Sequence, residues 1–227
     1  MSAARITALI AASLVWAALV VAAANRRFSG QGEDVSLGRL RRQVREEIAI
    51  FVAAVGLAVA ASVRFKSGWV AGLIALFLVF CFVLALGDLR WRIIPNALVY
   101  PAYLLFGAAV LALWAAGVEV SAGVAGLGML AFGGALLILA LLAPHGMGMG
   151  DVKLAGLIGL VLGALGWSYV VVAATGAILA GGVGGVVVLV RGGRKTRIPF
   201  GPYLVMGALV SGFFAPRIAH WYLGRLV

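Results

Sequence analysis

Two aspartates are the side chains of this sequence whose type and position could do chemistry. Asp88 ends a long apolar run and Asp151 begins another, and the chain holds only seven acidic residues among 227. A carboxylate at a membrane boundary carries a desolvation cost, so each of these two calls for a function. Two carboxylates that share one proton can hydrolyse a peptide bond. The ionised group takes a proton from water while the protonated group polarises the scissile carbonyl.

The composition is that of an integral membrane protein. Apolar residues make up 64% of the chain and charged residues 11%, with a mean hydropathy of +1.15. Soluble domains are roughly 45–50% apolar, and a soluble fold could not hide so many apolar side chains. The single cysteine, Cys81, excludes both an intrachain disulfide and a four-cysteine zinc site.

The apolar runs predict an all-α, polytopic transmembrane bundle of about eight spans, since a span needs about 20 mostly apolar residues. The run from 154 to 190 leaves open one tilted helix with a re-entrant piece, but residues 166–169 favour a turn between two helices. We expect a single membrane domain over 1–227. The predicted spans are 6–25, 48–64, 69–87, 97–117, 122–143, 154–167, 168–190 and 201–222.

The distribution of positive charge predicts the orientation. Eight spans place thirteen of the eighteen basic residues on one side, in the loops 26–47, 88–96, 144–153 and 191–200. Basic loops stay in the cytoplasm, so both termini are expected outside. Asp88 and Asp151 then lie on the same, cytoplasmic, side of the plasma (inner) membrane. The charge of +11 is therefore interpreted as membrane orientation and lipid contact, not as nucleic-acid binding.

The segment before Asp151 suits a protease. Gly146, Gly148 and Gly150 alternate with methionines, which gives a flexible backbone that an extended substrate can approach without a Cβ clash. Asp88 precedes Asp151 by 63 residues, enough for two intervening spans that return the chain to the same membrane face. The spacing therefore allows both carboxylates to meet in one site.

Three segments resemble the type IV prepilin peptidases. Residues 145–154 resemble the family's Gly-x-Gly-Asp segment, and residues 88–96 resemble its first aspartate with the following Ile-Pro-Asn turn. Residues 198–204 are similar to a third family segment at the start of a late span. The three occur in the family's order and define an expected peptidase core over 80–210.

The resemblance implies an aspartic endopeptidase that removes the short basic leader of prepilins or pseudopilins at the cytoplasmic membrane face, for type IV pili or type II secretion. It implies Asp88 and Asp151 as the catalytic acids, with no metal and no cofactor. The residues expected to bind substrate or shape the site are Gly148, Gly150, Lys153, Pro95 and Asn96. For Lys153, extension toward the membrane surface remains an alternative. A homo-oligomer is left open.

Larger family members carry a cysteine-containing N-terminal region and also methylate the new N-terminus. Residues 26–47 are short and lack cysteine, so methyltransferase activity is not expected and the chain resembles a shortened form.

A proton-coupled transporter or channel subunit is the alternative function. It would use intramembrane carboxylates near the middle of spans and show a repeat between its halves. Asp88 and Asp151 instead lie at span boundaries beside loop motifs, which favours the protease.

Overall fold

The computed structural model describes residues 52–53, 55–142, 147–190 and 199–223, and the regular structure in these ranges is α-helical. The predicted span 6–25 and the basic loop 26–47 lie outside the described residues. The chain divides into two compact units, 1–83 and 84–227, with the division inside one helix. The prediction of a single membrane domain stays a prediction.

The described part of the first unit consists of a short helix and the beginning of a long one. The short helix, Val55–Arg64, is apolar but below the length of a membrane crossing. The long helix α3 (Gly68–Trp91) follows it, and the Ser67 hydroxyl accepts a hydrogen bond from the amide of Val70 at 3.5 Å. A serine at this position satisfies an amide that the first turn leaves unpaired.

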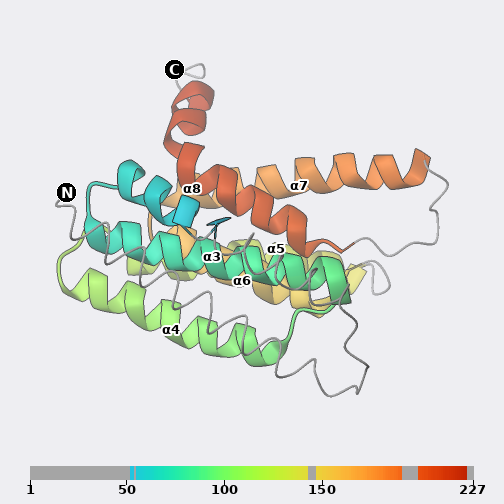
Figure 1. Ribbon diagram of the computed structural model, residues 1–227, viewed down its shortest axis with the longest axis horizontal. Helices are drawn as coiled ribbons and strands as arrows, with labels where there is room; N and C mark the ends of the chain where they lie inside the picture. Colours follow the sequence, from blue (N-terminus) through green and yellow to red (C-terminus); the bar gives the residue numbers. More distant parts are fainter. Residues whose placement is uncertain (1–51, 54, 143–146, 191–198, 224–227) are drawn as a thin grey trace. The chain divides into compact units, whose positions relative to one another are not determined.

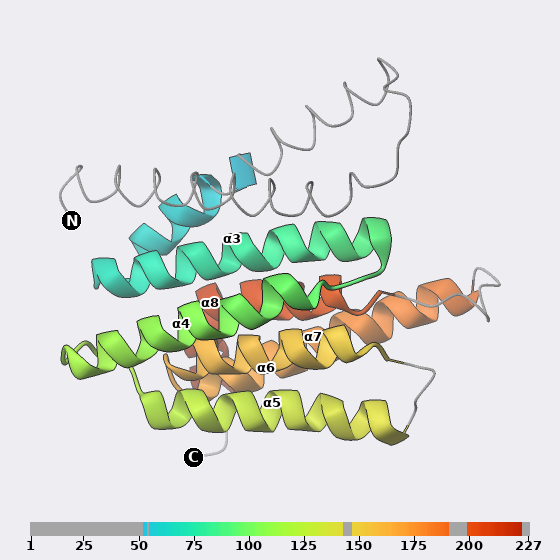
Figure 2. The same cartoon turned by 90° about the horizontal axis from the view of Figure 1, so that it is seen from below.

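The second unit holds the end of α3 and five further helices, arranged as two neighbouring pairs and α4 (Figures 1 and 2). In both views α5 lies beside α6 and α7 lies beside α8, and α6 also contacts α4, α7 and α8. These helices are α4 (Asn96–Ala115), α5 (Ala122–Leu142), α6 (Met149–Gly163), α7 (Trp167–Val190) and α8 (Gly201–Leu223).

Five helices in the described ranges are long and apolar enough to cross a membrane, so the protein is a polytopic helical membrane protein. They match the predicted spans 69–87, 97–117, 122–143, 168–190 and 201–222 within a few residues. The expected turn between two helices is confirmed, because Gly166 has a φ of +132° and separates α6 from α7. That conformation is open to glycine and strained for other residues. The alternative of one tilted helix with a re-entrant piece is not contradicted, since α7 is a candidate span and α6 is not.

The predicted sixth span, 154–167, differs most from the structure. α6 begins at Met149 and ends at Gly163, so it is 15 residues long and Asp151 lies inside its first turn instead of in the preceding loop. At 1.5 Å per residue it measures about 22 Å, less than the roughly 30 Å of a hydrocarbon core. α6 is not among the five candidate spans.

α6 is the buried centre of the second unit. Eleven of its 15 residues are buried, including Leu154, Leu157, Ile158 and Leu162. α5 turns one stripe toward it, because its buried residues recur at helical spacing: Ala125, Gly128, Phe132, Leu136 and Ala140. The remaining α5 surface is apolar and exposed, as lipid contact requires.

Glycines let α5 and α6 approach until their backbones touch. A Cβ added to Gly128 would lie 2.5 Å from the carbonyl oxygen of Gly159, and a Cβ on Gly159 would strike the carbonyl of Gly128. Small residues at such crossings allow the close packing by which transmembrane helices associate. This contact holds α6 against α5 where Gly128 meets Gly159.

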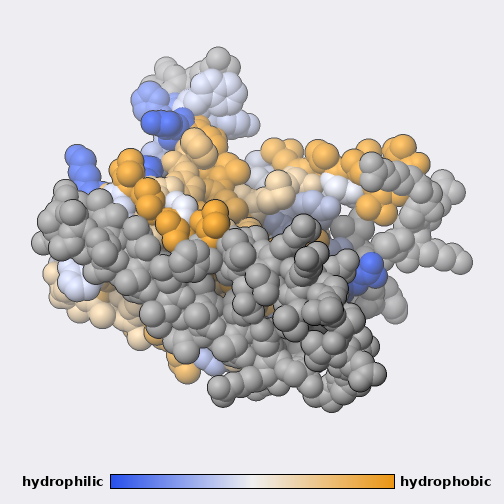
Figure 3. All heavy atoms as spheres, in the orientation of Figure 1, coloured by the Kyte–Doolittle hydropathy of each residue, from blue (hydrophilic) through white to orange (hydrophobic). Residues whose placement is uncertain are grey.

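The outer surface of α7 is hydrophobic. Figure 3 shows apolar side chains gathered along this helix, where Ile178, Leu179 and Val183 are exposed. α8 carries Pro216, and its last turns point away from the line of its first turns (Figure 1). Proline removes one helical hydrogen bond and is a regular cause of such a bend.

Candidate active site

Asp88 lies in the last turn of α3 and is 4% exposed. The helix ends three residues later at Trp91, because Arg92 takes a left-handed conformation (φ 54°). The Arg92 amide makes the last helical hydrogen bond, to the carbonyl of Asp88 at 2.8 Å. The carboxyl-terminal end of a helix is the negative end of its dipole and disfavours an anion. A charged Asp88 therefore needs stabilisation from another element.

Asp151 lies in the first turn of α6 and is 9% exposed. Gly148 is the residue at the N-cap, in an extended conformation, and its carbonyl accepts the amide of Asp151 at 3.1 Å. The positive end of the α6 dipole favours the charged form of this carboxyl. The two aspartates thus occupy opposite kinds of helix end.

The amide of Gly201, at the start of α8, brings the two carboxyls together. It donates a hydrogen bond to Oδ2 of Asp88 at 3.1 Å, and it also lowers the pKa of Asp151. A Cβ on Gly201 would lie 2.6 Å from Oδ2 of Asp88, so the contact admits no side chain. The sequence predicts Gly201 only as the first residue of the span 201–222. The motif of residues 198–204 was the available signal, but a main-chain amide carries no residue type of its own.

The environment makes Asp151 a weaker acid than a free aspartate. Burial raises the pKa of Asp151 from 3.8 to about 6, and the nearby negative charge of Asp88 adds to the rise. The amides of Gly148 and Gly201 lower this pKa in part. Two carboxyls that interact through charge titrate as a pair, so up to about pH 6 the pair can hold a single proton.

The five residues expected to shape the site gather where α4 and α6 begin. Pro95 is the N-cap residue of α4, and its carbonyl accepts the amides of Leu98 and Val99. Nζ of Lys153 donates to Oδ1 of Asn96 at 2.8 Å. Lys153 is therefore held by a specific partner on α4 instead of only extending toward the membrane surface.

The two glycines of the motif have different surroundings. Gly150 is packed against Ile94, whose Cβ would lie 2.9 Å from an added Cβ. Gly148 is exposed, and an added Cβ would stay 3.5 Å from Oδ2 of Asp151, an ordinary contact. Gly150 is thus required by packing, and Gly148 leaves open space in front of the carboxyl.

The start of α8 is seated on glycines of α7. A Cβ on Gly181 would strike the ring of Phe200, and a Cβ on Gly184 would strike the hydroxyl of Tyr203. Both aromatic residues flank Gly201, with ring centroids 6.1 Å apart. The α7 surface therefore fixes the place from which the Gly201 amide reaches Asp88.

Among the described residues, no group of three or more His, Cys, Asp or Glu side chains is close enough to hold a metal ion. The chemistry that the arrangement offers is acid and base catalysis by two carboxyls. Each is buried, and the Gly201 amide that donates to Asp88 also lowers the pKa of Asp151.

The sequence of the core matches one protein family. Residues 75–186, which contain both aspartates, match the type IV leader peptidase family. Residues 75–186 belong to this family. The family resemblance, which two segments within this range carry (88–96 and 145–154), is thereby confirmed, whereas the third segment, 198–204, lies beyond the matched residues and stays a prediction.

A curated relative gives the same result over a shorter stretch. The chain is 36% identical over 80 residues to the prepilin leader peptidase/N-methyltransferase of Legionella pneumophila. That stretch covers 34% of this chain and 27% of the relative, so the match spans about a quarter of the relative's length. No solved structure matches the chain at a significant level.

Proposed function

We propose that this protein is a membrane-embedded aspartic endopeptidase that removes the leader peptide of type IV prepilins or pseudopilins. One observation carries the proposal: Asp88 and Asp151 come from helices far apart in the sequence, yet the amide of Gly201 acts on both carboxyls. Membership of residues 75–186 in the type IV leader peptidase family supports the substrate class. The family match also favours a protease over a transporter or channel subunit.

In the proposed reaction the pair begins with one proton. The ionised carboxylate takes a proton from water, and the water oxygen attacks the carbonyl carbon of the scissile peptide. The protonated carboxyl donates its proton to the carbonyl oxygen. When the tetrahedral intermediate collapses, the carbon–nitrogen bond breaks and the leaving amine receives the proton that the first carboxylate took from water. The other carboxylate takes a hydroxyl proton from the intermediate, so the pair again holds one proton on its original member. Burial and the negative charge of Asp88 raise the pKa of Asp151 more than the α6 dipole and the nearby amides lower it, which favours Asp151 as the protonated member and Asp88 as the ionised one.

The substrate backbone is proposed to lie beside Gly148, which is exposed and presents no side chain next to Oδ2 of Asp151. A peptide must be extended where it is cut, and glycine lets two main chains approach closely. Gly150, Lys153, Pro95 and Asn96 then shape the wall of the site where α4 meets α6.

The proposed location is the plasma (inner) membrane, with the aspartates at the cytoplasmic face. The support is the distribution of basic residues, which gather in the loops on the side of Asp88 and Asp151. The expected partners are prepilins or pseudopilins and membrane lipid. Cleavage without methylation is part of the proposal, and mass spectrometry of the new N-terminus would test it.

The test is leader removal from a co-expressed prepilin. Asp88→Asn, Asp88→Ala, Asp151→Asn and Asp151→Ala should each lower cleavage by about 10²- to 10⁴-fold, the contribution typical of general acid or base catalysis. Glu119→Gln is the matched control, since Glu119 is an exposed acid in the loop after α4. Efficient cleavage by a well-expressed variant lacking either carboxyl would overturn the dyad.

A further inference from the structure

Three residues on one stripe of α4 hold Lys153. Asn96, Tyr100 and Tyr103 are spaced i, i+4 and i+7, so they lie on the same helix face. Oδ1 of Asn96 accepts from Nζ of Lys153 at 2.8 Å, and the Tyr100 ring centroid lies 4.8 Å from the same Nζ. The hydroxyl of Tyr103 donates to the main-chain carbonyl of Lys153 at 2.7 Å.

The third of these contacts differs from the other two, because it acts on the backbone of α6. A hydrogen bond to a main-chain oxygen fixes the height and rotation of the helix itself, whatever the Lys153 side chain does. Tyr103 also lies against Gly156, where an added Cβ would strike its hydroxyl. The tyrosine thus meets α6 at two points, one turn apart.

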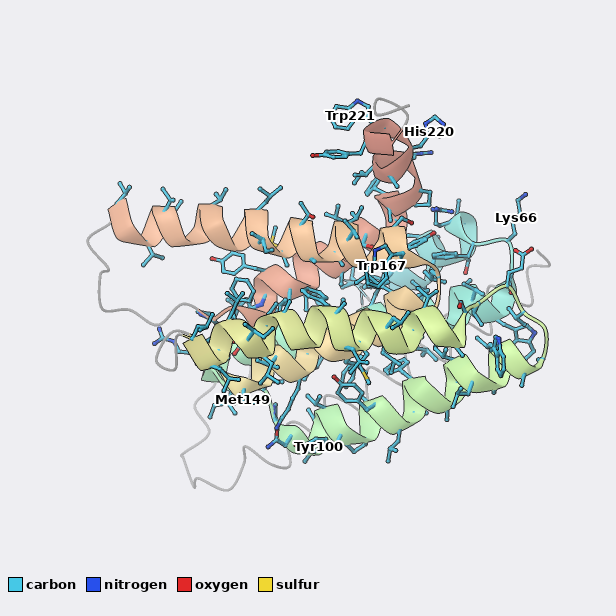
Figure 4. All side chains as sticks on the ribbon, turned by 180° about the vertical axis from the view of Figure 1, so that it is seen from behind. Lys66, Tyr100, Met149, Trp167, His220 and Trp221 are labelled. Carbon is cyan, nitrogen blue, oxygen red and sulfur yellow. The ribbon has the colours of Figure 1, made fainter. Side chains whose placement is uncertain are left out.

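This contact lies close to the catalytic end of α6 but on its other side. Asp151 and Lys153 are two residues apart, about 200° around the helix, so they face in nearly opposite directions. Asp151 faces Gly201 and Asp88, while Lys153 faces α4. Figure 4 labels Tyr100 and Met149, which lie at the neighbouring ends of α4 and α6.

We infer that Tyr103 is a positioning residue for the dyad: its hydroxyl anchors the first turn of α6 to α4 and so sets where Asp151 meets Asp88. Tyr103 touches neither carboxyl and is no catalytic residue. The inference rests on the proposed function for its catalytic readout, but the anchor itself can be measured without cleavage.

Tyr103→Phe removes the hydroxyl and keeps the ring. The lost hydrogen bond should lower kcat about fivefold, the rate equivalent of a typical hydrogen bond of about 1 kcal/mol. KM for the prepilin and the midpoints of the pH–rate profile should stay the same, because neither the substrate contacts nor the protonation of the pair depends on this hydroxyl. Tyr222→Phe is the matched control, since Tyr222 is exposed at the opposite end of α8 from Gly201.

Gly156→Ala supplies a test of mutual dependence. Its Cβ would strike the Tyr103 hydroxyl but would lie 3.6 Å from Cζ, so the same alanine fits once residue 103 is phenylalanine. Gly156→Ala should therefore reduce kcat severely in the wild-type background and by less than about twofold in the Tyr103→Phe background. Equal effects in both backgrounds would overturn the inference.

Hydrogen–deuterium exchange separates this inference from the proposed function. In detergent, Tyr103→Phe should speed amide exchange in a peptide covering 149–160 and leave a peptide covering 201–215 unchanged. If Tyr103→Phe speeds exchange but the wild-type protein cleaves no prepilin, the anchoring role of Tyr103 is supported and the proposed protease function is rejected. Normal exchange and normal kcat in an active Tyr103→Phe protein would reject the anchor. A shifted pH–rate midpoint in that variant would reject it too, because the hydroxyl would then act on protonation instead of position.

Discussion

Gly201→Ala tests the geometry of the site most directly, because it leaves both carboxyls in place. The added Cβ would lie 2.6 Å from Oδ2 of Asp88, and 3.1 Å from its Cγ. An ordinary contact begins near 3.4 Å, so Asp88 or the first turn of α8 must move by about 0.8 Å. A shift of about 1 Å in a catalytic group can cost about 10²-fold in rate.

The same substitution also weakens the hydrogen bond from the Gly201 amide to Asp88. A hydrogen bond to a charged group contributes roughly 1.5–3 kcal/mol, and overpacking costs about 1–3 kcal/mol. We expect Gly201→Ala to lower kcat about 10²-fold and to lower the free energy of unfolding by about 2 kcal/mol. Leader cleavage by purified protein and thermal unfolding in the same detergent measure the two effects.

Gly134→Ala in α5 is the matched control, since its added Cβ meets nothing within 4 Å. Alanine is the better helix former, so this variant should keep full activity and gain up to about 1 kcal/mol of stability. If Gly201→Ala cleaved prepilin as fast as Gly134→Ala, the contact between Gly201 and Asp88 could not be what arranges the pair.

Two further predictions concern Asp151 and the packing of α6. The raised pKa of Asp151 means that its charge destabilises the folded protein: the cost is absent below about pH 4, grows as pH rises through about 6, and reaches about 3 kcal/mol above it. Relative to the wild type, Asp151→Asn should therefore raise the unfolding temperature at pH 7.5 and not at pH 4, while cleavage is lost. The same difference from the wild type at both pH values would refute this. Gly159→Ala, whose Cβ would strike the carbonyl of Gly128, should destabilise the protein by about 2–3 kcal/mol, whereas Gly126→Ala meets nothing within 4 Å and should not. Comparable melting of these two alanine variants would refute the backbone contact between α5 and α6.

The sequence predicts the long helices well because their apolar runs have the length of a membrane crossing. It misplaces the start of α6, since glycines and the charges of Asp151 and Lys153 remove residues 149–153 from an apolar window. Packing overrides this local preference: Gly150 fits against Ile94, and the Tyr103 hydroxyl holds the carbonyl of Lys153. Tertiary contacts of this kind have no signature within a single segment.

In the candidate site, too, features within one segment can be predicted from the sequence and contacts between segments cannot. Asp88 and Asp151 stand out in the sequence because a charge beside an apolar run is costly, and the motif around each indicates a protease. The partners that hold them are harder to predict. Gly201 acts through a main-chain amide, and Tyr103 is one aromatic residue among many in an apolar chain. The spacing of Asn96, Tyr100 and Tyr103 was the available signal, and it gains meaning only once α6 lies beside α4.

The shortness of α6 has a consequence for how the thickness of the bilayer can affect the protein. A lipid-facing helix adjusts to membrane thickness by tilting, because its own hydrophobic length must match the hydrocarbon around it. α6 is packed among α4, α5, α7 and α8. Its length of about 22 Å therefore does not have to match the thickness of the hydrocarbon core. Its depth is set by its protein neighbours alone. A change in bilayer thickness can therefore alter the position of Asp151 only by tilting the helices around α6.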